Sequence, residues 1–147
     1  MHRPLLPLKF FLSEPIRFPT RLNRSFEEVS MISAIHTALS GLAAFGKQIE
    51  VVAHNIANVN TDGFKKSRTE FVEIPSGGVL PVIEKDDSSG PTILRDTDRN
   101  QTMVELSNVD LGEEAVQQIM AQRSFEANLQ TLRTGDALLG SILDLKK

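Results

Sequence analysis

The sequence contains no cysteine, which excludes disulfides, thiolate metal sites and cysteine nucleophiles. It also lacks any apolar run approaching the ~20 residues that a membrane-spanning helix requires. The opening stretch MHRPLLPLKFFL is partly apolar, but Pro4, Pro7 and Lys9 interrupt it and no small-residue cleavage site follows, so we expect no signal peptide. A strongly basic character is missing too, because the formal net charge is −3. We therefore expect neither direct membrane insertion nor nucleic-acid binding.

Groups that could carry catalysis are equally scarce. The sequence has no glycine-rich phosphate loop, no G-x-S-x-G elbow and no H-E-x-x-H motif. His36 and His54 fall about five helical turns apart in a predicted helix, too far to share a metal ion. Asp86 and Asp87 do not have the spacing of an EF-hand loop. The sequence therefore predicts no enzyme, no metal site and no cofactor.

The first thirty residues differ from the rest of the chain. Residues 1–30 hold four of the seven prolines and five basic against three acidic side chains, whereas the remaining residues are acidic overall. Proline blocks helix interiors, so we predict that residues 1–30 are a disordered extension. The alternative is that the start is misassigned and translation begins at Met31.

A heptad pattern begins shortly after Met31 and predicts a long helix. Apolar residues recur every seven positions in two complementary sets, which is the spacing that keeps one stripe against a partner helix. The first set is Ile35, Leu42, Ile49 and Ile56, and the second is Ala38, Phe45, Val52 and Val59. Ser33 is the expected N-cap, and the helix is expected from about Ala34 to about Val59. Gly63 is expected to adopt the left-handed conformation just beyond it.

Short β-like segments occupy the middle of the chain. Val79–Glu84 and Thr92–Arg95 flank a cluster of turn formers at residues 86–91, which predicts a single small hairpin. Pro81 would confine the first strand to an edge. Residues 96–101 are expected to form a loop.

A second long helix is predicted from Leu111 to about Leu145. Asp110 and Glu113 have the spacing of a capping box at its start. Its apolar stripe consists of Phe125, Leu129, Leu132, Leu139, Ile142 and Leu143. Val116, Ile119 and Met120 lie out of phase with that stripe, which predicts a stutter in the seam.

These elements predict a mainly α protein in which two long terminal helices pair as an antiparallel, coiled-coil-like hairpin around a small β-hairpin insert. The expected segments are residues 1–30, an N-terminal helix and motif at 31–64, a β-rich insert at 65–107 and a C-terminal helix at 108–147. Periodicity alone leaves open whether the stripes form a private core or one shared between chains.

Two sequence motifs favour a shared core. The run from Asn55 to Phe64, N-I-A-N-V-N-T-D-G-F, resembles the N-I-A-N-x-x-T-x-G-F/Y motif of the bacterial flagellar axial family of rod and hook proteins. His54 departs from that family, which usually has a second asparagine or another small polar residue there. A second match begins at Asn108. The matched residues expected to matter are Asn55, Asn58, Thr61, Gly63, Phe64, Asn108, Arg123 and Asn128.

The resemblance implies a small proximal rod protein of the flagellar basal body. Such a protein is exported from the cytoplasm through the flagellar type III apparatus and assembles with copies of itself and with other rod and hook proteins. The residues expected to form the assembly stripe are Ile35, Leu42, Phe45, Ile49, Val52, Ile56, Phe125, Leu129, Leu132, Leu139 and Ile142. The alternative function is a cytosolic helical chaperone or adaptor of flagellar export.

Overall fold

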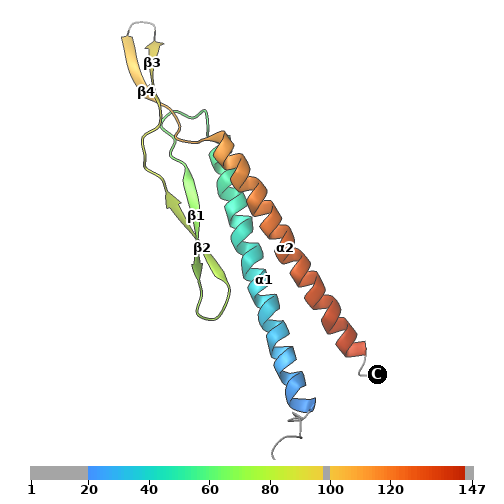
Figure 1. Cartoon of the computed structure of the whole chain (residues 1–147). Coiled ribbons are helices and arrows are strands. Elements are labelled where there is room, and N and C mark those ends of the chain that lie inside the picture. Colours follow the sequence, from blue (N-terminus) through green and yellow to red (C-terminus); the bar gives the residue numbers. More distant parts are fainter. Residues whose placement is uncertain (1–19, 98–99, 145–147) are drawn as a thin grey trace, which may run out of the picture.

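A computed structural model describes residues 20–97 and 100–144. The chain order is α1 (Thr20–Ala57), β1 (Ser67–Glu73), β2 (Val79–Lys85), β3 (Thr92–Thr97), β4 (Asn100–Glu105) and α2 (Leu111–Asp144). The two helices run antiparallel side by side, and the strands lie between them in sequence (Figure 1). The predicted fold class, a helical hairpin with a small β insert, is confirmed.

Helix α1 begins earlier than predicted. It starts at Thr20 and passes through Ser33 without interruption, so Ser33 does not cap it. All four early prolines, Pro4 to Pro19, precede Thr20, and the eleven residues that follow contain none. The structure describes residues 20–30 as the first turns of α1, and the absence of proline there is compatible with a helix. That residues 1–30 are a disordered extension or follow a misassigned start stays a prediction. For residues 1–19 it lies outside the described part of the chain.

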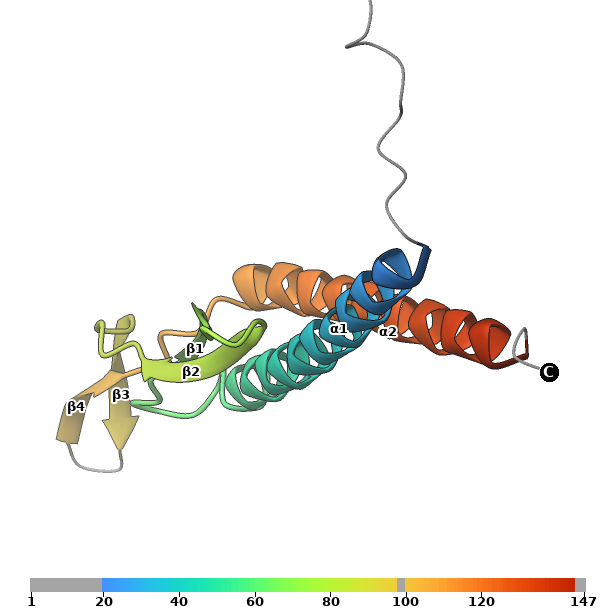
Figure 2. The same ribbon diagram turned by 90° about the horizontal axis from the view of Figure 1, so that it is seen from below.

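The two helices meet along a seam of small and polar residues. On α2 the seam positions fall every seven residues, at Glu114, Ala121, Asn128 and Gly135, and Ala121 is fully buried. The side chain of Asn128 lies directly against Gly41 of α1, and that of Ile35 lies against Gly135. Small side chains at these points let the helix backbones approach closely. Toward their far ends the helices cross and separate (Figure 2).

The predicted stutter near Met120 is wrong. The seam keeps its seven-residue spacing through this stretch of α2, with Glu114 and Ala121 buried between the helices. Val116, Ile119 and Met120 are out of phase because they point away from the seam, and 56–59% of their surface is exposed. They belong to a second apolar face of α2.

The strands form two hairpins, whereas the sequence predicted one. β1 pairs with β2, and β3 pairs with β4, both antiparallel. The predicted pairing of Val79–Glu84 with Thr92–Arg95 is therefore wrong, and residues 96–101 are mostly strand. The first turn lies at Gly77 and Gly78, whose φ angles of 91° and 97° favour glycine. Pro81 lies in β2 opposite Phe71, and β2 is an edge strand as predicted.

The hairpins differ in their contacts with the helices. The β1–β2 hairpin lies along α1, where the ring of Phe71 packs edge-on against that of Phe45 with centroids 5.1 Å apart. The β3–β4 hairpin projects beyond the end where α1 stops and α2 starts, and packs against neither helix in the described residues (Figure 1). Neither described helix contains an apolar stretch that could cross a membrane.

Candidate assembly surfaces

The Asn55–Phe64 motif forms the turn by which the chain leaves α1. The Nδ2 of Asn58 donates to the carbonyl of His54, 2.9 Å away, which satisfies a free carbonyl at the end of the helix. The hydroxyl of Thr61 donates to Oδ1 of Asn58. Gly63 has φ 67°, the left-handed conformation that its position predicts, and its N–H donates to the carbonyl of Glu105. Phe64 folds back so that its ring lies 5.4 Å from that of His54.

Asn55, the first residue of the motif, fastens the end of α1 to β1 and α2. Its side chain is 1% exposed and exchanges two hydrogen bonds with the backbone of Ser67, one to the N–H at 2.9 Å and one to the carbonyl at 2.8 Å. Its Nδ2 also donates to the carboxylate of Glu114. Glu114 is 3% exposed, and burial raises the pKa of its carboxyl. A buried polar side chain has lost its hydrogen bonds to water, so it is stable only where its protein partners replace them. Asn55 and Glu114 therefore favour one relative position of α1, β1 and α2.

A cluster of ion pairs surrounds this fastening. Lys66 is buried, and its Nζ lies 2.9 Å from the carboxylate of Glu113, which also pairs with Arg68 at 2.7 Å. These hydrogen bonds, the one from Lys66 first, lower the pKa of Glu113. Asp86 lies 3.8 Å from Lys66. Glu113 thus pairs with Lys66, which directly precedes β1, and with Arg68 of β1. The start of α2 is capped by Asp110, whose Oδ1 accepts from the N–H groups of Gly112 and Glu113.

Asn108 organises the chain before α2. Its Oδ1 accepts from the N–H of Lys66 at 2.7 Å, and its Nδ2 donates to the carbonyls of Asp86 and Ser88. Of the other two matched residues in this half, Asn128 lies in the seam, and Arg123 is exposed in an ion pair with Glu126. The structure therefore gives structural contacts to every matched residue, although Arg123 stays at the surface.

The predicted stripe lies on or beside the pairing surface of the helices. Val52 is buried and the other stripe residues are half-buried, so none of them is freely exposed. In this position the stripe residues contribute at least in part to packing within the chain. The stripe's role in contacts between subunits remains a prediction.

The exposed apolar surface lies elsewhere. From residue 30 onward, where the structure describes the burial of side chains, the buried apolar core consists of Ala38, Ala44, Val51, Val52 and Ala121. By contrast, large apolar side chains lie exposed on both helices and both hairpins. On the helices these are Ile32, Leu39, Leu111, Val116, Ile119, Met120, Leu138 and Leu143. A surface with this much apolar area and so small a core is typical of a protein that buries area against partners.

Comparisons with known proteins find relatives that match both ends of the chain. Residues 35–65 match the family model described as flagella basal body rod protein, and residues 100–145 match that described as flagellar basal body rod FlgEFG protein C-terminal. The flagellar basal-body rod protein FlgC of Borreliella burgdorferi is 30% identical over 148 residues, an alignment that covers 78% of this chain and 97% of that protein. The chain belongs to the flagellar basal-body rod protein family.

Other relatives, a rod protein and a hook protein, match only in part. The rod protein FlgG of Caulobacter vibrioides is 49% identical over 43 residues, which cover 29% of this chain and 16% of FlgG. The hook protein FlgE of Escherichia coli is 44% identical over 43 residues, which cover 29% of this chain and 11% of FlgE. The chain thus spans about a sixth or less of the length of these longer relatives. Membership makes it a flagellar basal-body protein, and the matched relatives carry structural and not enzymatic names.

Sequence reasoning missed the buried contacts at the junction of the helices and strands. The sequence-based prediction assigns no role to Glu114, Lys66 or Arg68. The signal that could have found Glu114 is its seven-residue spacing from Ala121, Asn128 and Gly135. That column is small and polar, so a search for apolar residues passed over it.

Proposed function

We propose that this chain is a structural subunit of the flagellar basal-body rod that is exported from the cytoplasm and polymerises through its terminal helices. The observation that carries the proposal is the exposed apolar face of α2 at Val116, Ile119 and Met120, set beside a core of only small apolar side chains. Burial of apolar surface is the main driving force for association.

In this proposal, different surfaces of the two helices make the contacts within a subunit and the contacts between subunits. Seam residues join α1 to α2 within one subunit, and the outer faces of the same helices are available to neighbours. Head-to-tail contacts of one face with a different face on the next copy do not close into a dimer, and they generate a helical tube when the rotation does not close. Other copies, together with other rod and hook proteins, are therefore the proposed partners.

The proposal retains the segments expected from the sequence, except that the first helix begins at Thr20. We infer that the helix and motif at 31–64 and the helix at 108–147 are the assembling parts. The β-rich insert at 65–107 holds them in register through the hydrogen bonds of Ser67 with Asn55 and of Lys66 with Asn108. We also infer that the predicted assembly stripe gains contacts with neighbouring subunits where it is only half-buried.

A secretion assay separates this proposal from the alternative of a cytosolic export chaperone. None of the relatives described above is named as a chaperone. In cells that lack the hook, a rod subunit should pass through the export apparatus and appear in the medium. A chaperone would stay in the cytoplasm, so retention of this chain, while a known rod protein of the same cells is secreted, would exclude the proposed function.

A further inference from the structure

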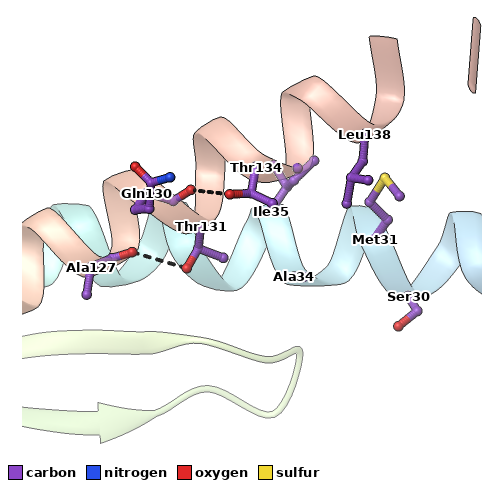
Figure 3. A pocket seen from close by; sticks show the side chains of 10 residues that line it. Ser30, Met31, Ala34, Ile35, Ala127, Gln130, Thr131, Thr134 and Leu138 are labelled. Atoms are coloured by element: carbon purple, nitrogen blue, oxygen red, sulfur yellow. Dashed lines mark hydrogen bonds between the residues drawn. The ribbon is translucent and has the colours of Figure 1, made fainter. Parts of the chain in front are cut away.

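A wide groove between α1 and α2 has a mainly apolar lining. Its volume is about 880 Å³, and the side chains of Met31 and Leu138 point toward one another across it (Figure 3). The hydroxyls of Thr131 and Thr134 also line it, and both donate to backbone carbonyls of the same helix. Because these hydroxyls already have partners, the groove is mainly an apolar surface.

A smaller cavity, of about 110 Å³, lies where α1, β1 and α2 meet, and its lining is mainly polar. Helix α1 contributes Gln48, Val51 and Val52, strand β1 contributes Ser67, Arg68, Thr69 and Glu70, and helix α2 contributes Glu114 and Gln117. The cavity therefore touches all three elements that the Asn55 side chain fastens together.

Two buried polar atoms at this cavity have no hydrogen-bond partner within the described part of the chain. They are Oε1 of Gln48 and Oγ1 of Thr69. The other end of the Gln48 amide is satisfied, because its Nε2 donates to Oε1 of Gln117 at 3.2 Å. A polar atom loses its hydrogen bonds to water when it is buried, so leaving it without a partner lowers the stability of the fold. Both atoms therefore favour a ligand that can hydrogen-bond to them.

Glu114 adds a third polar group to the cavity. It is 3% exposed, and among the described residues its carboxylate accepts one hydrogen bond, from Nδ2 of Asn55 at 3.2 Å. The nearby cations Lys66 and Arg68 pair with Glu113 instead. An ionised carboxylate has about four sites for accepting hydrogen bonds, so Glu114 can bind a further donor.

The lining determines which ligand fits. The Glu114 carboxylate and Oε1 of Gln48 accept hydrogen bonds, whereas the Thr69 hydroxyl can donate as well as accept. Arg68 lines the same cavity, and its positive charge disfavours a bound cation. A small neutral molecule that both donates and accepts satisfies all three side chains. Water has these properties, and 110 Å³ holds about three water molecules at ~30 Å³ each.

We propose that ordered water molecules occupy this cavity and hydrogen-bond to Gln48, Thr69 and Glu114. Buried waters of this kind make two to four hydrogen bonds each, which the three side chains and the neighbouring waters provide. The waters thereby join α1, β1 and α2 beside the Asn55 side chain. This inference goes beyond the assembly function and does not depend on it.

Nuclear magnetic resonance of the dilute full chain tests for the waters directly. An enclosed water exchanges slowly and gives a negative nuclear Overhauser effect at nearby protein protons, whereas surface water exchanges too fast to do so. We expect negative effects from water at the methyl groups of Val51 and Val52, which line the cavity, and none at those of the exposed control Val116. Absence of the effect at both Val51 and Val52, or an equal effect at Val116, would overturn the inference.

Replacing the Thr69 hydroxyl provides a second measurement, in which the sign of the change is decisive. Thr69→Val keeps the shape of the side chain and removes the hydroxyl. If water fills the cavity, this variant loses a hydrogen bond, and its urea midpoint should fall by roughly 0.3–1 M. If the cavity is dry, the variant removes a buried polar atom that has no partner, and the midpoint should rise.

The matched control is Thr102→Val in β4, where the threonine is exposed. It makes the same exchange in a strand, so it corrects for the greater strand preference of valine. We expect its midpoint to stay the same or to rise slightly. A Thr69→Val midpoint equal to or above that of the unmodified chain, or a fall matched by Thr102→Val, would overturn the inference.

Discussion

The close approach of the two helices at Gly41 leads to a quantitative prediction. A Cβ atom placed on Gly41 would lie 2.6 Å from Oδ1 and 2.9 Å from Cγ of Asn128. The Asn128 side chain is held by a 2.8 Å hydrogen bond from its Nδ2 to the carbonyl of Ser124, so it cannot move aside without losing that bond. Gly46, one and a half turns along the same helix, provides the matched control. A Cβ there meets only Cε2 of Phe125, at 3.9 Å.

The magnitudes follow from two opposing effects. Replacing glycine by alanine inside a helix stabilises it by about 1 kcal/mol, and Gly46→Ala should show that gain. In Gly41→Ala the gain is opposed by overpacking of about 1–3 kcal/mol and by loss of the Asn128 hydrogen bond, about 1 kcal/mol. We therefore expect Gly41→Ala to lower the free energy of unfolding by about 1–3 kcal/mol.

Urea unfolding followed by circular dichroism at 222 nm measures both variants under one condition. The double variant Gly41→Ala/Asn128→Ala should recover most of the loss, since removing the Asn128 side chain makes room for the new methyl group. The reasoning is refuted if Gly41→Ala raises stability as much as Gly46→Ala does. That result would mean that the helices do not meet at Gly41.

Three further predictions concern the helix ends and the buried polar groups. Burial raises the pKa of the Glu114 carboxyl above that of the unfolded chain, so its ionisation lowers the stability of the fold once the pH exceeds the unfolded pKa. Glu114→Gln should therefore be more stable than the unmodified chain at pH 7, and the difference should vanish below about pH 4, where the carboxyl is protonated in both states. Asn108→Ala should lose about 2–3 kcal/mol in chemical denaturation, because it leaves the N–H of Lys66 and the carbonyl of Asp86 without their partner. Circular dichroism of the dilute full chain should show less helix than the 38 residues of α1 and 34 of α2, because the separated far ends order fully only against neighbours.

Each of these has a contrary result. A Glu114→Gln variant that is less stable at pH 7 by the same amount as at pH 4 would show that burial of the charge costs nothing. An Asn108→Ala loss below ~0.5 kcal/mol would mean that water replaces the side chain. Full helicity at the lowest measurable concentration would argue against ordering on assembly.

The helices were predictable because their periodicity repeats over many turns. Apolar residues from Ile35 to Ile56 recur every seven positions over four repeats, and a pattern this long indicates a helix even where single residues, such as glycine, disfavour one. The end of α2 near Asp144 and its cap at Asp110 followed from local chemistry in the same way. The Gly63 conformation was predictable too, since few residues other than glycine adopt it.

The strand pairing was not predictable from local signals. Residues 86–91 are richer in turn formers than Ser76-Gly77-Gly78, yet the first hairpin turns at the glycines. The longer cluster instead forms a connection held by Asn108 and Lys65, through hydrogen bonds from residues 20 and 23 positions away. Such partners are distant in sequence, so turn composition alone cannot separate a hairpin turn from an anchored loop.

The buried fastening at Asn55 and Glu114 escaped prediction for a related reason. Each residue has an ordinary local interpretation, a helix C-terminal asparagine and a first-turn acid. The hydrogen bond between Asn55 and Glu114 depends on the antiparallel register of α1 and α2, which brings the two side chains within 3.2 Å of each other. Only the paired helices define that register.

The most direct test of the central claim is the incorporation of a variant of the outer face into isolated basal bodies. Ile119→Asp places a charge on the exposed apolar face of α2, and Gln122→Asp places the same charge on an exposed polar position one turn away. Immunoblots of purified basal bodies should detect the unmodified chain and Gln122→Asp at similar levels, and Ile119→Asp at less than about a tenth of them, although all three are secreted equally. Normal incorporation of Ile119→Asp would contradict assembly through this face.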